Sequence, residues 1–131
     1  MPTTFEYTQN FTGSPSDVFS VLSQEDFILA KCAATGSLST QASVKEDMDS
    51  HVHTLTSIRV LPADLPAPAK SLVGDTITVT ETQKWSAPDP DGARTATVTV
   101  EFSGPMGFTG TLELTPTQAG NTTITTRGTF T

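Results

Sequence analysis

The stretch DTITVTETQKWSAPDPDGARTATVTVEF, residues 75–102, has the clearest alternation in the chain and decides the fold. Polar and apolar residues alternate along its first half, up to Trp85, and again along its second half, from Thr95 to Phe102. Because successive side chains of a strand point to opposite faces, this period of two predicts a pair of half-buried antiparallel strands. Residues 87–92 contain two prolines and a glycine, which cannot continue a ladder and therefore predict the connecting turn.

Two polar residues, Glu81 and Gln83, interrupt the apolar face of the first strand. The other residues on this face are Ile77, Val79 and Trp85. A carboxylate among apolar side chains needs a hydrogen-bond partner or a wet cavity, because burying it alone is very costly. One hypothesis is that Glu81 and Gln83 line an internal pocket and orient the polar end of a ligand. The alternatives are that a bulge or the strand end leaves them in solvent, or that Glu81 pairs with Arg59 or Arg127.

Two short helices are predicted near the start of the chain, after a first strand at residues 4–11. Ser14 is placed to cap the first helix, with Pro15 at its first position. Ser23 is predicted to cap the second, which Gly36 is placed to end. Apolar residues follow each cap at helical spacing, which indicates that one side of each helix is buried.

After Gly36 the sequence has strand character throughout. Alternating residues predict strands at 42–48 and 52–61, the two strands of 75–102, and two more at 108–114 and 124–130. The polar segment 47–50 predicts a turn between the first two, and the proline-rich segment 62–68 runs into a possible turn of helix at 69–73. The order strand, two helices, six strands predicts an α+β fold with a meander of about seven antiparallel strands.

The composition narrows the classes of function that the protein can have. A chain of 131 residues fits one domain, residues 1–131, with a single core. Fourteen acidic and seven basic residues give a net charge of −7 without a basic cluster, which disfavours nucleic acid as a partner. No apolar run is long enough for a membrane span, and the N-terminus lacks the features of a signal peptide. Cys32 is the only cysteine, so no internal disulfide can form, which favours a reducing, cytoplasmic location.

The element order, together with scattered sequence positions, resembles the helix-grip superfamily of START domains, polyketide cyclases and the birch-pollen allergen. It is most similar to an uncharacterised actinobacterial branch of that superfamily. The residues that carry the resemblance are Ser14–Phe19, Glu25–Lys31, Leu65–Pro66, Lys70–Gly74, the strand ending at Trp85, and Gly110–Pro116. The resemblance implies a curved sheet that encloses an apolar cavity with the two helices, and binding of a small hydrophobic or amphipathic molecule there.

The expected ligand-binding residues combine this resemblance with the strand phases. They are Tyr7, Phe27, Val79, Glu81, Gln83, Trp85, Val100, Phe102, Phe108 and Ile124. Further cavity-wall residues are expected to be Phe11, Ile77, Val98, Leu112 and Phe130. A binding protein without a cofactor is favoured, but two other classes stay open. One is a cyclase- or aromatase-like enzyme in which Glu81 transfers protons, and the other is an interaction domain that uses the concave sheet face.

Two other residue groups have side chains that could carry chemistry. Asp47, Asp49, His51 and His53 have a spacing of two and could bind a metal on a continuous strand, but they straddle the predicted turn. A solvated turn is therefore expected, with no metal site. Cys32 lies among alanines on a predicted helix and is expected to pack rather than to act as a nucleophile.

The helix-grip fold ends in a long helix that lies against the concave face, and nothing follows the last predicted strand here. Leaving such an apolar face wet would forfeit many kilocalories at about 25 cal/mol per Å². The expectation is either that the chain is a fragment lacking a C-terminal helix, or that a second copy or a partner covers the face.

Overall fold

The computed structural model describes residues 3–63, 66–68, 71, 74–103 and 107–130. Its seven strands and first two helices follow the predicted order. Their bounds are β1 Thr3–Phe11, α1 Pro15–Leu22, α2 Glu25–Ala33, β2 Ser39–Glu46, β3 His53–Pro62, β4 Thr76–Trp85, β5 Arg94–Phe102, β6 Gly107–Pro116 and β7 Thr122–Phe130. The predicted α+β class, with two short helices after the first of seven strands, is confirmed.

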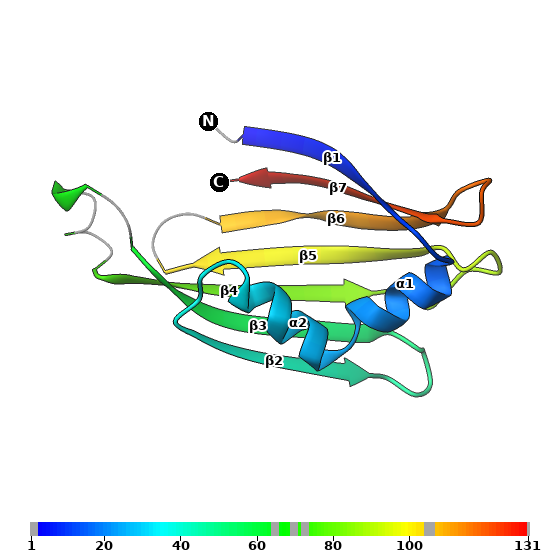
Figure 1. The fold of residues 1–131 in the computed structure, drawn as a ribbon, viewed down its shortest axis with the longest axis horizontal. Helices are drawn as coiled ribbons and strands as arrows, with labels where there is room; N and C mark the ends of the chain where they lie inside the picture. The colour runs from blue at the N-terminus through cyan, green and yellow to red at the C-terminus, as the bar shows by residue number, and fades with distance from the viewer. Residues whose placement is uncertain (1–2, 64–65, 69–70, 72–73, 104–106, 131) are drawn as a thin grey trace.

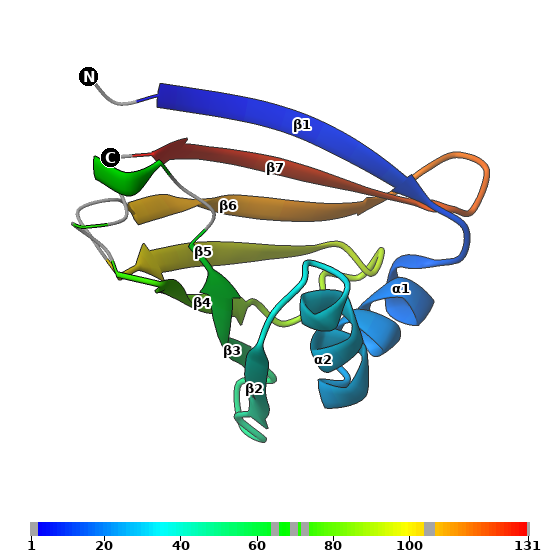
Figure 2. The same ribbon diagram turned by 60° about the vertical axis from the view of Figure 1, so that its left-hand side comes forward.

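All seven strands form one antiparallel sheet in the order β1-β7-β6-β5-β4-β3-β2. Strands β2 to β7 pair consecutively, which is the predicted meander, and β1 pairs with β7 so that the first and last strands lie side by side. The sheet is curved, and α1 and α2 lie on its concave side (Figures 1 and 2). The halves of β1, β7 and β6 near the chain ends extend beyond the helices.

Strands β4 and β5 are the pair predicted from residues 75–102. Their register runs from Val79 opposite Phe102 to Trp85 opposite Ala96. In the turn between them, the backbone N–H of Asp89 donates to the carbonyl of Ala93 at 2.8 Å. Gly92 has a φ of 87°, a backbone conformation that glycine adopts without strain. The predicted hairpin is confirmed.

Helix α1 begins as predicted, but the predicted start of the next helix is wrong. The Ser14 Oγ accepts the backbone N–H of Asp17 at 3.2 Å, and Pro15 occupies the first turn. Ser23 is the C-cap of α1, and its hydroxyl donates to the carbonyl of Phe19 at 2.8 Å. Helix α2 therefore starts after Gln24, whose side chain makes no capping hydrogen bond. The Phe19 carbonyl also accepts the backbone N–H of Ser23 at 3.0 Å, so the Ser23 hydroxyl adds a second hydrogen bond at the end of α1.

Replacing Ser14 with alanine is expected to lower the free energy of unfolding by about 1 kcal/mol, because the Asp17 N–H loses its acceptor at the helix start. Urea unfolding followed by far-UV circular dichroism measures this change. Ser16→Ala is the matched control: Ser16 is exposed in the same helix and caps nothing, so its effect should stay within about 0.5 kcal/mol. Equal losses in the two variants would contradict the capping role of Ser14.

Both bounds of β2 differ from the predicted 42–48. β2 ends at Glu46, so Met48 lies in the turn rather than on the strand and is 74% exposed. Asp47 closes this turn, since its Oδ1 accepts the backbone N–H of Asp49 at 2.9 Å and that of Ser50 at 3.3 Å. The predicted helical turn at 69–73 falls largely outside the described residues. Among the described residues, no helix is long and apolar enough to cross a membrane.

The core lies between the helices and one end of the concave face. The Phe19 ring of α1 meets Trp85 edge-on, with ring centroids 5.4 Å apart, and the Arg94 guanidinium stacks over the Phe19 ring at 3.8 Å. Burial lowers the pKa of Arg94, because the charged guanidinium loses part of its hydration in this position. The other buried members of the cluster are Val18, Ile28, Cys32, Leu55, Ala96, Leu114 and Ile124. The helices are thus fixed at one end of the sheet, and a cavity remains beside them.

Candidate functional site

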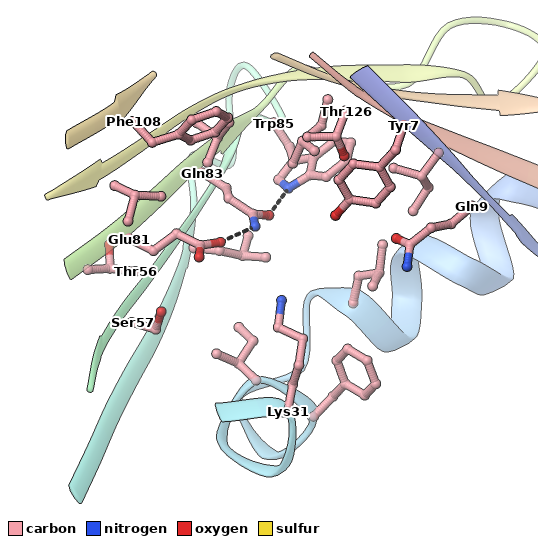
Figure 3. Close-up of a pocket in the computed structure, with 18 of the residues that line it drawn as sticks. Tyr7, Gln9, Lys31, Thr56, Ser57, Glu81, Gln83, Trp85, Phe108 and Thr126 are labelled. Carbon is pink, nitrogen blue, oxygen red and sulfur yellow. Dashed lines mark hydrogen bonds between the residues drawn. The ribbon is translucent and has the colours of Figure 1, made fainter. Parts of the chain in front are cut away.

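A cavity of about 450 Å³ lies between the concave face of the sheet and the helices. All strands except β2 contribute to its wall, together with Leu22 of α1 and with Phe27, Ile28 and Lys31 of α2. Most of the lining side chains are aliphatic or aromatic (Figure 3). Pockets that bind small molecules have this size and this mostly apolar character, with a few polar groups that fix orientation.

Most of the residues expected to bind a ligand lie in this wall. The ones that line the cavity are Tyr7, Phe27, Glu81, Gln83, Trp85, Val100, Phe108 and Ile124, with Phe11, Val98 and Leu112 from the wider set. Val79 is buried elsewhere, at 1% exposure, and Phe102 is half-buried outside the lining. Ile77 and Phe130 do not line the cavity either. They lie toward the far end of their strands, beyond the reach of the helices.

Glu81, Gln83 and Trp85 form a hydrogen-bonded row along β4, called the polar stripe below. The indole Nε1–H of Trp85 donates to Oε1 of Gln83 at 2.9 Å, and Nε2 of Gln83 donates to Oε2 of Glu81 at 2.6 Å (Figure 3). The three residues are at alternate positions, so a regular strand brings their side chains to one face. Glu81 and Gln83 therefore line the cavity, as the pocket hypothesis requires, and their role in orienting a ligand stays a prediction.

The alternatives for Glu81 are not realised. The ladder is regular on both sides of Glu81, which lies opposite Ser57 on β3 and Val100 on β5, and its side chain is half-buried. Arg127 pairs instead with Glu6 and Glu113 on the convex face. Arg59 reaches the Sγ of Cys32 at 3.9 Å. Neither arginine contacts Glu81 within the described part of the chain.

Lys31 and Ser57 also line the cavity, and neither is among the expected ligand-binding residues. The Lys31 ammonium points into the cavity toward the polar stripe, and the Ser57 side chain lies beside Glu81 (Figure 3). Ser57 is 7% exposed. A signal for Lys31 was its position four residues after Phe27 and three after Ile28, which puts all three on one side of α2. A signal for Ser57 was its phase with Leu55 on the same strand.

An aromatic cluster on β1, β6 and β7 borders the cavity through Phe5, Tyr7 and Phe108. The Phe5 ring contacts Tyr7, Phe108 and Phe130 with centroids 5.8, 5.1 and 5.5 Å away, and Phe108 also contacts Phe130 at 5.1 Å. The Phe108 ring lies over the backbone of Gly128, where any Cβ would overlap it. Glycine at 128 therefore lets this ring lie flat against the sheet, which leaves the cavity open above it.

Residues 47–52 connect β2 to β3, and His53 is the first residue of β3. The backbone N–H groups of Asp49 and Ser50 hold the pKa of the Asp47 carboxyl below its ordinary value. His51 and His53 both approach Glu46, with nitrogen–oxygen distances of 3.6 and 3.7 Å. Within the described residues, no three histidine, cysteine or acidic side chains gather in a way that could hold a metal ion.

Cys32 lies in the core at 1% exposure, as predicted. Its neighbour Arg59 has an Nε that is buried without a hydrogen-bond partner in the described structure. The contact between Arg59 and Cys32 joins β3 to α2. It places neither side chain in the lining of the cavity.

Residues 6–131 match the family described as "Protein of unknown function (DUF2505)", and the chain belongs to that family. None of the curated proteins searched matches the sequence. Among solved structures, the fold is similar to the Mll3558 protein from Rhizobium loti, with a TM-score of 0.54 and 17% identity over 100% of this chain and 81% of that one. An uncharacterised protein from Rhizobium leguminosarum gives 0.58 and 10% over 99% and 77%. DR_A0006 from Deinococcus radiodurans gives 0.50 and 15% over 98% and 82%. At these sequence identities, the similarity shows the fold alone.

Proposed function

We propose that this DUF2505 protein binds a small amphipathic molecule in the cavity between its sheet and its helices. The observation that carries the proposal is a cavity of about 450 Å³ whose apolar wall includes one organised polar feature, the polar stripe ending at Glu81. Apolar walls supply binding energy in proportion to the area removed from water, and a few polar groups set the orientation. No chemistry is required for this role.

A test uses the dye Nile red, which is neutral and fluoresces in apolar surroundings. The parent protein is expected to bind it, and Val100→Phe is expected to weaken binding about tenfold or more, since the added ring would fill the cavity beside Glu81. Thr99→Phe is the matched control, because Thr99 is exposed on the opposite face of the same strand. Its affinity should equal that of the parent.

Thermal unfolding of both variants checks that the fold is kept, and emission of Trp85, the only tryptophan, gives a second reading from the cavity wall. Equal Nile red affinity in Val100→Phe and Thr99→Phe would contradict binding in this cavity. Native mass spectrometry of freshly purified protein then identifies any molecule that it carries.

A proton-transfer enzyme is the second candidate. The observation in its favour is that Lys31 and Tyr7, two further titratable groups, line the same cavity as Glu81. A ligand recovered unchanged after incubation supports the binding role. A ligand that is converted by the parent and not by Glu81→Gln supports the enzyme.

The kinship with helix-grip proteins, and a second copy or partner on the concave face, stay predictions. Two features favour a covered face: the sheet extends beyond both helices, and Tyr7 of the aromatic cluster is 48% exposed.

A further inference from the structure

The direction of the hydrogen bonds in the polar stripe follows from chemistry. An indole N–H can only donate, so the atom of Gln83 that meets it must be the amide oxygen. The amide nitrogen then faces Glu81 and donates to it. The assignment of oxygen and nitrogen in a glutamine is usually open, but here the donor-only neighbour on one side and the carboxylate on the other both require the same orientation.

The polar stripe therefore ends in an acceptor. A carboxylate only accepts, and one oxygen of Glu81, Oε2, is occupied by Gln83. The other oxygen, Oε1, has no hydrogen-bond partner in the described part of the chain. Glu81 is half-buried in the cavity wall, between Ser57 and Val100 on the neighbouring strands. A molecule in the cavity thus meets a fixed negative acceptor at this point.

Lys31 carries the other charge in the lining, and it lies in a different setting. It is exposed on α2, with its ammonium at the end of a flexible stem that points into the cavity from the helix side (Figure 3). A hydrated, mobile ammonium discriminates weakly between head groups, because solvent screens it and ordering its stem costs entropy. The preorganised Glu81 acceptor is the stronger determinant of what binds.

We infer that the ligand is an amphiphile whose polar head donates a hydrogen bond to Glu81, as a hydroxyl or a protonated amine does, on an apolar body. This inference rests on the proposed binding function. A donor head satisfies the free oxygen of Glu81. A carboxylate head would leave two acceptors facing each other with like charge, and such unpaired groups are how a site rejects the wrong ligand.

The experiment compares 1-octanol, octylamine and octanoate, which share one chain and differ in the head. Displacement of Nile red is measured below the aggregation limit of each probe and at physiological salt. The parent protein is expected to bind 1-octanol and octylamine at least about tenfold more tightly than octanoate. In Glu81→Gln, which supplies a donor in the same shape, octylamine should weaken and octanoate should tighten, so that the preference is lost.

Glu101→Gln is the matched control, and Lys31→Met tests the other charge in the lining. Glu101→Gln removes a carboxylate from the exposed face of β5, and it should leave the order of the three probes unchanged if nonspecific attraction of the amine to an acidic protein is not the cause. Lys31→Met should also keep the order. Tightest binding of octanoate, lost in Lys31→Met, would overturn the inference while leaving cavity binding intact.

Equal affinity for the three heads, or no displacement by any of them, would overturn the inference as well. A different result would contradict the binding function itself: Val100→Phe would bind Nile red as tightly as the parent protein does.

Discussion

Trp85→Ala is expected to lower the free energy of unfolding by about 3–5 kcal/mol, which is a large part of the 5–15 kcal/mol typical of a domain. Trp85 is 1% exposed and packs edge-on against Phe19, so truncation opens a void where α1 meets the sheet. It also leaves the amide oxygen of Gln83 without its donor. Urea unfolding followed by far-UV circular dichroism measures the loss.

Trp85→Phe separates the two parts of this effect. Phenylalanine keeps an aromatic ring against Phe19 and removes the indole N–H, so its cost should be about 1–3 kcal/mol and clearly less than that of the alanine variant. An alanine variant within about 1 kcal/mol of the parent would mean that the helix end relaxes to fill the void, and that Trp85 does not fix α1 on the sheet.

Gly110→Ala is expected to cost about 3 kcal/mol, at the upper end of overpacking effects. Gly110 lies opposite Gly128 in the ladder between β6 and β7. A Cβ on Gly110 would overlap the carbonyl oxygen of Arg127 and come within 2.9 Å of the Gly128 Cα. These obstacles are backbone atoms, so the clash is relieved only by opening the ladder. Chemical unfolding compares the variant with the parent.

Gly120→Ala is the contrast for this prediction. A Cβ at Gly120 meets nothing within 4 Å, but the φ of 80° strains any residue other than glycine, and this costs about 1 kcal/mol. If the two variants lose the same stability, crowding between β6 and β7 is not what requires glycine at position 110.

The alternating strands could be predicted because their pattern is local. The phase of Glu81, Gln83 and Trp85 followed from the sequence of β4 alone, and it places all three side chains on the cavity side. Helix boundaries were less certain for an equally local reason. Only two residues, Ser23 and Gln24, separate α1 from α2, so a serine there suits the end of one helix as well as the start of the next.

The rest of the cavity depends on packing between distant elements. Lys31 and Ser57 face the same space only because the curved sheet brings β3 under α2, and no local pattern encodes that curvature. The same holds for the limits of the cavity. Val79 and Phe102 have the correct phase, yet they lie outside the lining because the helices cover only one end of the sheet.

The polar stripe also bears on how the hairpin aligns during folding. A shift of β4 by one residue against its neighbours would turn Glu81, Gln83 and Trp85 to the convex side and bring Lys84 to the concave one. The Trp85 indole would lose its packing against Phe19, and the Lys84 ammonium would face apolar side chains. Only the native alignment satisfies both faces at once. The three residues that shape the cavity thus also make misaligned hairpins high in free energy, which narrows the routes by which the chain can misfold.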